Sequence, residues 1–140
     1  MLHHVRPWRE RAFAPNRVLE ITPQFLDRTL AVAKELGFEL ASLDEVPGRL
    51  AAPGRPFAAV TFDDGYRDTV EHALPVLRRH GAPFTVFVTT GFAEGTGRLW
   101  WVELEEAIAR LDRVAVTVGG ERFSAPCGTP PEKAAAFDGL

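Results

Sequence analysis

The sequence predicts an α/β fold with parallel strands, and three observations lead to this fold class. Two apolar runs, residues 57–62 and 83–90, lack polar alternation, which is typical of strands covered on both faces in a parallel sheet. Residues 67–80, between them, have apolar side chains at helical spacing, so strand, helix and strand follow as in a βαβ unit. The chain has 140 residues, 46% of them hydrophobic and 25% charged, which suits one folded domain, residues 1–140.

The part of the chain before the first apolar run contains one clear helix. Residues 1–5 are interpreted as a strand stub that leaves into a polar loop with prolines. A helix is predicted from Thr22 as N-cap and Pro23 at its first position to a stop at Gly37. Its apolar positions at helical spacing are Phe25, Leu26, Leu30, Ala33 and Leu36. Residues 38–46 are predicted to be extended and residues 47–56 to form a Pro/Gly loop.

The helix over residues 67–80 is expected to kink at Pro75, because proline cannot donate a backbone hydrogen bond. Val70, Ala73, Leu74 and Leu77 are assigned to one side of this helix. After the second apolar run we expect a loop over residues 91–98, an amphipathic helix over 99–111 and a hairpin that turns at residues 119–120. A last short helix begins after Thr129.

Composition excludes several classes of function. The formal net charge is −3 and no basic stripe is present, so nucleic acid is not expected as a partner. No apolar stretch is long enough to span a membrane, and the first residues lack the apolar centre of a secretion signal. We therefore expect a cytoplasmic protein, or an exported one if a signal precedes Met1. The single cysteine, Cys127, cannot form an internal disulfide and is interpreted as an ordinary small residue.

Two adjacent carboxylates, Asp63 and Asp64, follow the first apolar run directly in the stretch "TFDDGY". Ligands of parallel α/β proteins bind at the carboxyl ends of the strands, where loops and helix N-termini converge. Neighbouring side chains on extended backbone point in different directions, so one carboxylate could face a metal ion and the other a reacting water. The simpler alternative is a turn, in which an aspartate caps the next helix and Gly65 supplies a permissive backbone.

The surrounding residues favour the first interpretation. The segment "VTFDDGYRDTVEHALPVLRRHGAPFTVFVTTGF" resembles the first motif and following βαβ segment of the polysaccharide deacetylase family, the NodB-homology carbohydrate esterases of family 4. "LHHV" near the start resembles the Tyr-His-x-Val first strand of one branch of that family. "LWWVELEEAIAR" resembles the insertion that this branch carries after its third strand.

This resemblance implies a TIM-like (β/α) barrel, here partial, with the hairpin as an insertion. It also implies a divalent metal, most often zinc, that activates water to attack an N-acetyl group on a polysaccharide or oligosaccharide. By position, Asp63 matches the general base and Asp64 matches the aspartate metal ligand. His3 matches a histidine near the active-site mouth, with a core or edge histidine as the alternative, and His4, on the alternate side of the strand, is assigned a structural role.

The sequence departs from the family pattern further along the chain. The family's His-[Ser/Thr]-x-x-His segment does not occur, and neither an Arg-Pro motif nor an acid histidine follows the second apolar run, so the zinc site is incomplete. We therefore interpret residues 1–140 as the N-terminal portion of a deacetylase domain, truncated before the metal-binding histidines. A partial barrel leaves a sheet edge open, which predicts either a homo-oligomer through that edge or poor solubility.

Three functions remain open from the sequence. The first is half of a deacetylase site. The second is a non-catalytic relic that binds carbohydrate or a partner, and the third is a hydrolase completed in a homodimer, with His3 of one chain joining Asp64 of another.

No substrate-binding residue is assigned. Trp100 and Trp101 are expected to be core residues or a sugar platform. His72 and His80 are assigned to a helix surface or a helix end, and a solvated helix face is predicted for Glu103, Glu105 and Glu106.

Overall fold

The computed structural model describes residues 1–52 and 54–140, and the chain divides into two compact units. Unit 1 comprises Met1–Trp8 and Leu19–Gly97, and unit 2 comprises Arg9–Val18 and Arg98–Leu140. Within the described ranges, no helix combines the length and the apolar character that a membrane crossing requires.

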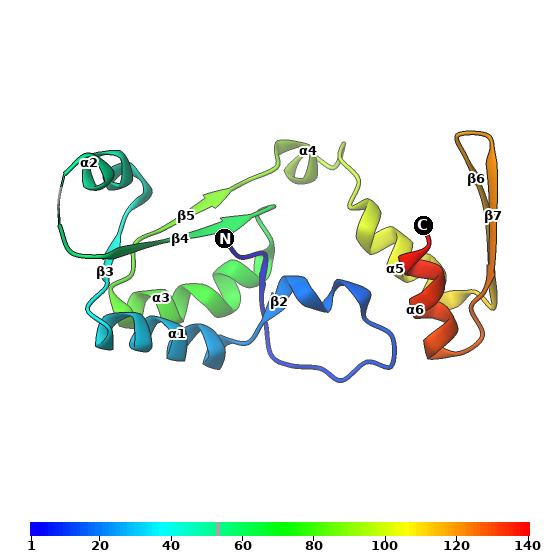
Figure 1. Ribbon diagram of the computed structural model, residues 1–140, viewed down its shortest axis with the longest axis horizontal. Coiled ribbons are helices and arrows are strands. Elements are labelled where there is room, and N and C mark those ends of the chain that lie inside the picture. The colour runs from blue at the N-terminus through cyan, green and yellow to red at the C-terminus, as the bar shows by residue number, and fades with distance from the viewer. Residues whose placement is uncertain (53) are drawn as a thin grey trace. The chain divides into compact units, whose positions relative to one another are not determined.

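The sheet of unit 1 confirms the predicted mixed α/β fold with parallel strands (Figure 1). Strands β3 (Glu39–Ala41), β4 (Phe57–Asp63) and β5 (Phe84–Phe87) lie in this order, and β4 is parallel to both neighbours. The register pairs Val60 with Phe84 and Asp63 with Phe87. The described strands form no closed barrel.

The N-terminal residues extend this sheet beside the end of β4. Leu2 forms a parallel bridge with Phe62, in which its N–H donates to the Thr61 carbonyl and its carbonyl accepts from the Asp63 N–H, both at 2.9 Å. The chain continues into β1 (His4–Val5), which pairs in parallel with β2 (Glu20–Ile21) after the 3-10 helix η1 (Pro15–Leu19). The predicted strand stub is thus confirmed, and it places His3 and His4 next to the exit of β4.

Helix α1 (Pro23–Glu35) begins as the sequence predicts. The Thr22 hydroxyl accepts a hydrogen bond from the Phe25 N–H at 3.0 Å, and Pro23 occupies the first turn. The predicted apolar face is only partly buried: Leu26 and Leu30 are in the core, but Phe25 is 60% exposed. The prediction for Phe25 was wrong because the residue lies in the first turn, outside the stripe of α1 that packs into the core.

The segment between β3 and β4 contains helix where the end of an extended stretch, residues 38–46, and a loop were predicted, so the extended prediction holds only for β3. A short 3-10 helix η2 (Leu43–Glu45) leads into helix α2 (Val46–Ala51). Pro47 lies in the first turn of α2. Backbone N–H groups in a first turn have no partner within the helix, so the missing N–H of proline costs nothing there. The predicted loop over residues 47–56 was therefore wrong in its first half, and Pro53 lies outside the described residues.

The helix after the acidic pair changes its type next to Pro75, where the sequence predicted a kink. A π-helical turn η3 (Thr69–Ala73) precedes α3 (Leu74–His80), and Pro75 occupies the first turn of α3. The Pro75 nitrogen has no hydrogen to donate to the preceding turn, which accounts for the change in helical pitch at this point. Helix α3 ends at Gly81, which has φ 58°. This is the left-handed conformation in which glycine commonly ends a helix.

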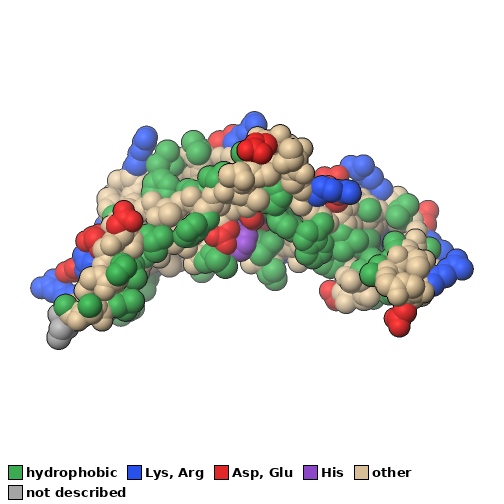
Figure 2. All heavy atoms as spheres, turned by 90° about the horizontal axis from the view of Figure 1, so that it is seen from above, with side chains coloured by type: hydrophobic (Ala, Val, Ile, Leu, Met, Phe, Trp, Pro, Cys, Tyr) green, Lys and Arg blue, Asp and Glu red, His purple; other side chains and the backbone are tan. Residues whose placement is uncertain are grey.

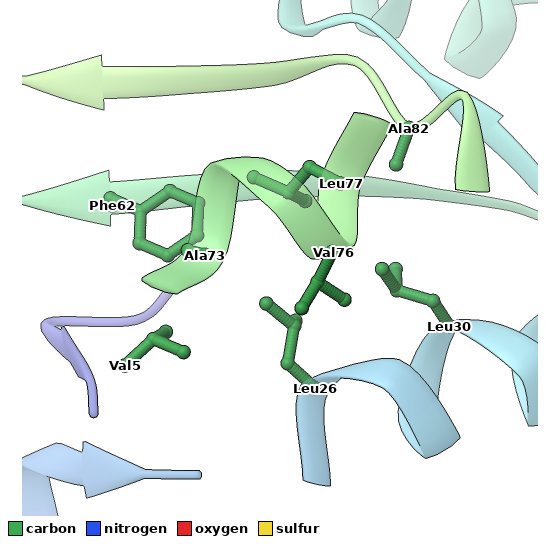
Figure 3. Packing of buried hydrophobic residues seen from close by; sticks show 8 residues of the cluster. All are labelled: Val5, Leu26, Leu30, Phe62, Ala73, Val76, Leu77 and Ala82. Carbon is green, nitrogen blue, oxygen red and sulfur yellow. The ribbon is translucent and has the colours of Figure 1, made fainter. Parts of the chain in front are cut away.

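The core of unit 1 lies between β4, α1 and α3. Figure 3 shows Phe62 of β4 directed at Ala73 and Leu77, with Leu26 and Leu30 of α1 facing Val76. Phe62 and Leu77 are fully buried. Val70 is 65% exposed, so its predicted place on the apolar side of this helix was wrong.

The opposite face of the sheet is less covered than the sequence predicted. Phe62 is the one residue of β4 that is fully buried in the described structure, and the others keep partial exposure. Helices α1 and α3 lie on the same side of the sheet (Figure 1). The prediction that both faces of β4 are covered is therefore not met by the described residues. Helix α4 (Thr90–Ala93) after β5 also replaces part of the predicted strand and loop.

Unit 2 contains helix α5 (Trp100–Arg110), the antiparallel hairpin β6 (Arg113–Val118) and β7 (Glu121–Pro126), and helix α6 (Pro130–Asp138). The predicted amphipathic helix and the hairpin that turns at residues 119–120 are confirmed. Its core is formed by Ile108, Val114, Cys127 and Ala136.

Candidate functional site

The acidic pair lies in a tight turn at the end of β4. The Asp63 carbonyl accepts a hydrogen bond from the Gly65 N–H at 2.9 Å. Asp64, between them, has φ 69°, and Gly65 has φ 75°. Asp64 is the one non-glycine residue with positive φ in the described chain, and a hydrogen bond across such a residue forms a strained γ-turn. Local strain of this kind gathers at functional sites, where the surrounding structure holds it in place.

Asp63 and His3 face each other at this turn. The Nε2 of His3 lies 3.9 Å from Oδ2 of Asp63, and the two side chains are 24% and 26% exposed. Side chains alternate along a strand, so the burial of Phe62 against the helices directs Asp63 to the opposite, open face of the sheet. The structure therefore brings together two of the three candidate site residues, on a face that solvent and a substrate can reach.

The Asp64 carboxylate is partly exposed, and the described residues form no hydrogen bond or ion pair with it. The turn of the simpler alternative is present, with Gly65 at φ 75°, but no aspartate of the pair caps the next helix in the described structure. Asp68 occupies the N-cap position of η3, and its side chain makes no capping hydrogen bond. The two carboxylates are thus not engaged as helix caps.

A buried polar cluster lies beside the turn, and no sequence pattern assigned it to the site. The Nδ1 of His4 is 2.6 Å from Oδ2 of Asp68, and the Val5 N–H donates to Oδ1 of Asp68 at 3.4 Å. The His4 ring packs against the Tyr66 ring, with centroids 3.7 Å apart and the ring planes tilted by 31°. Asp68 lies four residues after Asp64, at the start of the helix. Its position as an acidic residue so close to the pair was the one feature of the sequence that could have pointed to this cluster.

The donor set does not fit a complete zinc site. Across the described ranges, no group of three or more His, Cys, Asp or Glu side chains is placed to hold one metal ion. Catalytic zinc sites use three protein ligands and a water. His3, Asp63 and Asp64 therefore do not constitute a metal centre by themselves.

The remaining histidines lie away from the turn. His80 Nε2 is 3.0 Å from Oδ1 of Asp27, and the Arg79 guanidinium donates to the same carboxylate at 2.9 Å. These hydrogen bonds, first from Arg79 and then from His80, lower the pKa of Asp27 below its ordinary value. His72 lines a surface pocket of about 390 Å³ between α1 and α3, on the helix side of the sheet. His80 is the last residue of α3, which agrees with its assignment to a helix end.

Unit 2 carries the aromatic candidates. Trp100 is 64% exposed, whereas Trp101 is half-buried, and their rings meet edge to face with centroids 5.7 Å apart. Glu105 was predicted to be solvated, but its carboxylate accepts from Arg11 at 3.1 Å and from Asn16 at 2.8 Å. That prediction was wrong because residues 9–18 pack on this face of α5. Cys127 is a buried core residue, as expected.

Exposed hydrophobic side chains accompany the open edge of the sheet. Phe84, Phe87 and Val88 are 37%, 51% and 55% exposed, and β5 pairs on one side with β4. Figure 2, the view from above, shows hydrophobic side chains at the surface among charged ones. Within the described residues, the outer edge of β5 has no strand partner.

Comparison with known proteins confirms the predicted resemblance. Residues 51–119, which include β4, the acidic turn and β5, match the model of the polysaccharide deacetylase family. No curated protein matches the chain.

Two solved structures are similar to the chain. One is a Streptococcus pyogenes deacetylase, PplD, in complex with acetate, at 27% identity and a TM-score of 0.54, covering 66% of this chain and 42% of that one. The other is a de-N-acetylase from Aggregatibacter actinomycetemcomitans, at 16% identity and a TM-score of 0.50, covering 91% of this chain and 44% of that one. The second likeness concerns the fold alone. The chain thus spans less than half the length of either structure.

Proposed function

We propose that this chain, whose residues 51–119 match the polysaccharide deacetylase family, carries part of a site that hydrolyses N-acetyl groups on a polysaccharide or oligosaccharide. The observation that carries the proposal is the placement of Asp63 and Asp64 in a strained turn at the carboxyl end of β4. Neither carboxylate caps a helix there, and Asp63 faces His3 on the open side of the sheet.

In this proposal Asp63 is the general base. A carboxylate at the end of a strand, 26% exposed, can reach a water molecule and accept its proton. The nearby His3 ring, at 3.9 Å, can orient the Asp63 carboxylate or contact the substrate at the mouth of the site. Amide hydrolysis also needs stabilisation of the oxyanion that forms at the acetyl carbon.

Asp64 is proposed as one ligand of a divalent metal ion, and zinc is the metal that we propose. The metal would supply a Lewis acid for the amide oxygen and a more acidic water. Because the described residues do not complete such a site, we derive no catalytic step through it. The other ligands would come from residues outside these 140, in a barrel of which unit 1 forms a part, or from a second copy of the chain.

The decisive experiment is acetate release from an N-acetylglucosamine oligomer with added Zn²⁺. We compare the 140-residue chain with the longest polypeptide encoded in the same reading frame. We expect the chain by itself to release little or no acetate and any longer product with a His-[Ser/Thr]-x-x-His segment to be active. Asp63→Asn and Asp64→Asn should each remove that activity, whereas the exposed Asp138→Asn should not. Metal-dependent acetate release that survives Asp63→Asn would overturn the proposal.

One observation favours a second function, carbohydrate binding without catalysis. The 64% exposure of Trp100 leaves an aromatic face open to a sugar ring. In that case the chain would bind the same oligomer stoichiometrically, without metal, and Trp100→Ala would abolish binding. The open edge of β5 supports a further proposal, self-association through that edge. A sedimentation experiment that finds a monomer at all concentrations would exclude it.

A further inference from the structure

We infer that His4 and Asp68 are positioning residues that clamp the turn of the acidic pair. The inference rests on the proposed function, because it assigns these two residues to the site that Asp63 and Asp64 form. Neither residue needs to touch the substrate. Their role follows from the way in which they tie the chain on both sides of the turn to one short N-terminal segment.

The first tie lies before the turn. Leu2 exchanges two backbone hydrogen bonds with β4, from its N–H to the Thr61 carbonyl and from the Asp63 N–H to its carbonyl, each at 2.9 Å. These bonds fix the backbone of Asp63 itself. They leave Asp64 and the residues after it without support from the sheet, because β4 ends at Asp63.

The second tie lies after the turn and depends on side chains. Asp68 accepts from the His4 ring at 2.6 Å with one carboxylate oxygen, and from the Val5 N–H at 3.4 Å with the other. A carboxylate oxygen only accepts, so the proton of this hydrogen bond is on Nδ1 of His4. The side chains of His4 and Asp68 are 11% and 13% exposed, which shields the pair from competing water. The contact of the His4 ring with the Tyr66 ring, with centroids 3.7 Å apart, adds a contact directly after the turn.

The backbone between the two ties needs such support. Asp64 has φ 69°, a conformation that an L-residue does not adopt readily. Strained residues persist where the surrounding structure over-determines them. Two fixed points, Leu2 on Asp63 and His4 on Asp68, enclose the strained residue and belong to the same N-terminal segment. The clamp thus sets the direction of the Asp64 carboxylate relative to Asp63 and His3.

The chain offers a matched control for testing the clamp. Asp27 is also a carboxylate that contacts a histidine ring, with His80 Nε2 at 3.0 Å, but it joins α1 to α3 on the helix side of the sheet. Asp68→Asn and Asp27→Asn make the same chemical change in these two pairs. Amide hydrogen exchange at residues 63–66 and the NMR resonances of the His3 ring report on the turn in each variant.

We expect Asp68→Asn to speed exchange of the Gly65 amide at least tenfold and to shift the His3 ring resonances, whereas Asp27→Asn leaves both unchanged. His4→Leu should have the same effect as Asp68→Asn. His4→Asn keeps an N–H near the position of Nδ1 and should restore slow exchange in large part. That rescue separates positioning from a general loss of packing, and it keeps the inference testable if His4→Leu does not fold.

Equal exchange at Gly65 in Asp68→Asn and Asp27→Asn would overturn the inference, as would a His4→Asn variant that behaves like His4→Leu. Failure of the proposed function gives a different result. If the variants change exchange at Gly65 as expected but neither the chain nor a longer product releases acetate, the positioning role of His4 and Asp68 stands and the deacetylase assignment is wrong.

Discussion

Replacing Gly65 by alanine tests the turn of the acidic pair most directly. Gly65 has φ 75°, and a Cβ at this position would lie 3.2 Å from Cγ1 of Val88. The left-handed conformation costs an alanine about 1–2 kcal/mol, and the close contact adds a further cost of about 1 kcal/mol for overpacking. We therefore expect Gly65→Ala to lower the free energy of unfolding by about 2–3 kcal/mol.

Alanine substitutions at two other glycines separate the cost of the left-handed backbone from the cost of the contact with Val88. Gly37 has φ 82°, but no atom lies within 4 Å of the place that a Cβ would take, so Gly37→Ala should cost the backbone term of about 1–2 kcal/mol alone. Gly48 lies in α2 without positive φ and without a close neighbour, so Gly48→Ala should stabilise the protein by about 0.5–1 kcal/mol. In the double variant Gly65→Ala/Val88→Ala, the contact term of about 1 kcal/mol should disappear.

The assay is urea unfolding at equilibrium, followed by far-ultraviolet circular dichroism, with all variants at one pH. The order of stability should be Gly48→Ala, wild type, Gly37→Ala and then Gly65→Ala. If Gly65→Ala is as stable as the wild type, the turn does not have the described backbone, and Asp64 is not held in a strained conformation.

The remaining predictions concern packing and pH. Phe62→Ala should lower the free energy of unfolding by about 3–5 kcal/mol, because Phe62 is fully buried. Phe25 is 60% exposed, so Phe25→Ala should change the free energy of unfolding by less than about 1 kcal/mol. Urea titrations measure both values. Hydrogen bonds from Arg79 and His80 lower the folded-state pKa of Asp27 from 3.8, so its contribution to stability is present above that pH and is lost as the pH falls through the lowered pKa. Asp27→Asn should therefore flatten the loss of stability below about pH 4 in thermal melts; an unchanged slope would contradict the pairing.

Sequence reasoning located the catalytic candidates because local patterns determine where a strand ends. The apolar run 57–62 predicted β4, and its carboxyl end predicted the place of Asp63 and Asp64. Thr22 and Pro23 predicted the start of α1, and the glycine pair 119–120 predicted the hairpin, since caps and turns depend on neighbouring residues.

Other features depended on contacts between distant segments. The pairing of His4 with Asp68 joins residues 64 positions apart, and nothing in either local stretch indicates the other. The burial of Glu105 by residues 9–18 and the exposure of Phe25 likewise follow from packing rather than from spacing.

The amino-acid sequence by itself determined the parallel βαβ unit, the helix caps and the acidic pair at the end of β4, because each depends on short-range periodicity and turn chemistry. Only the tertiary structure decided that Asp63 faces His3, that Asp64 is held at positive φ, and that His4 and Asp68 enclose the turn. Those relations arise when Leu2 pairs with β4 and brings the N-terminal strand beside residues more than sixty positions later.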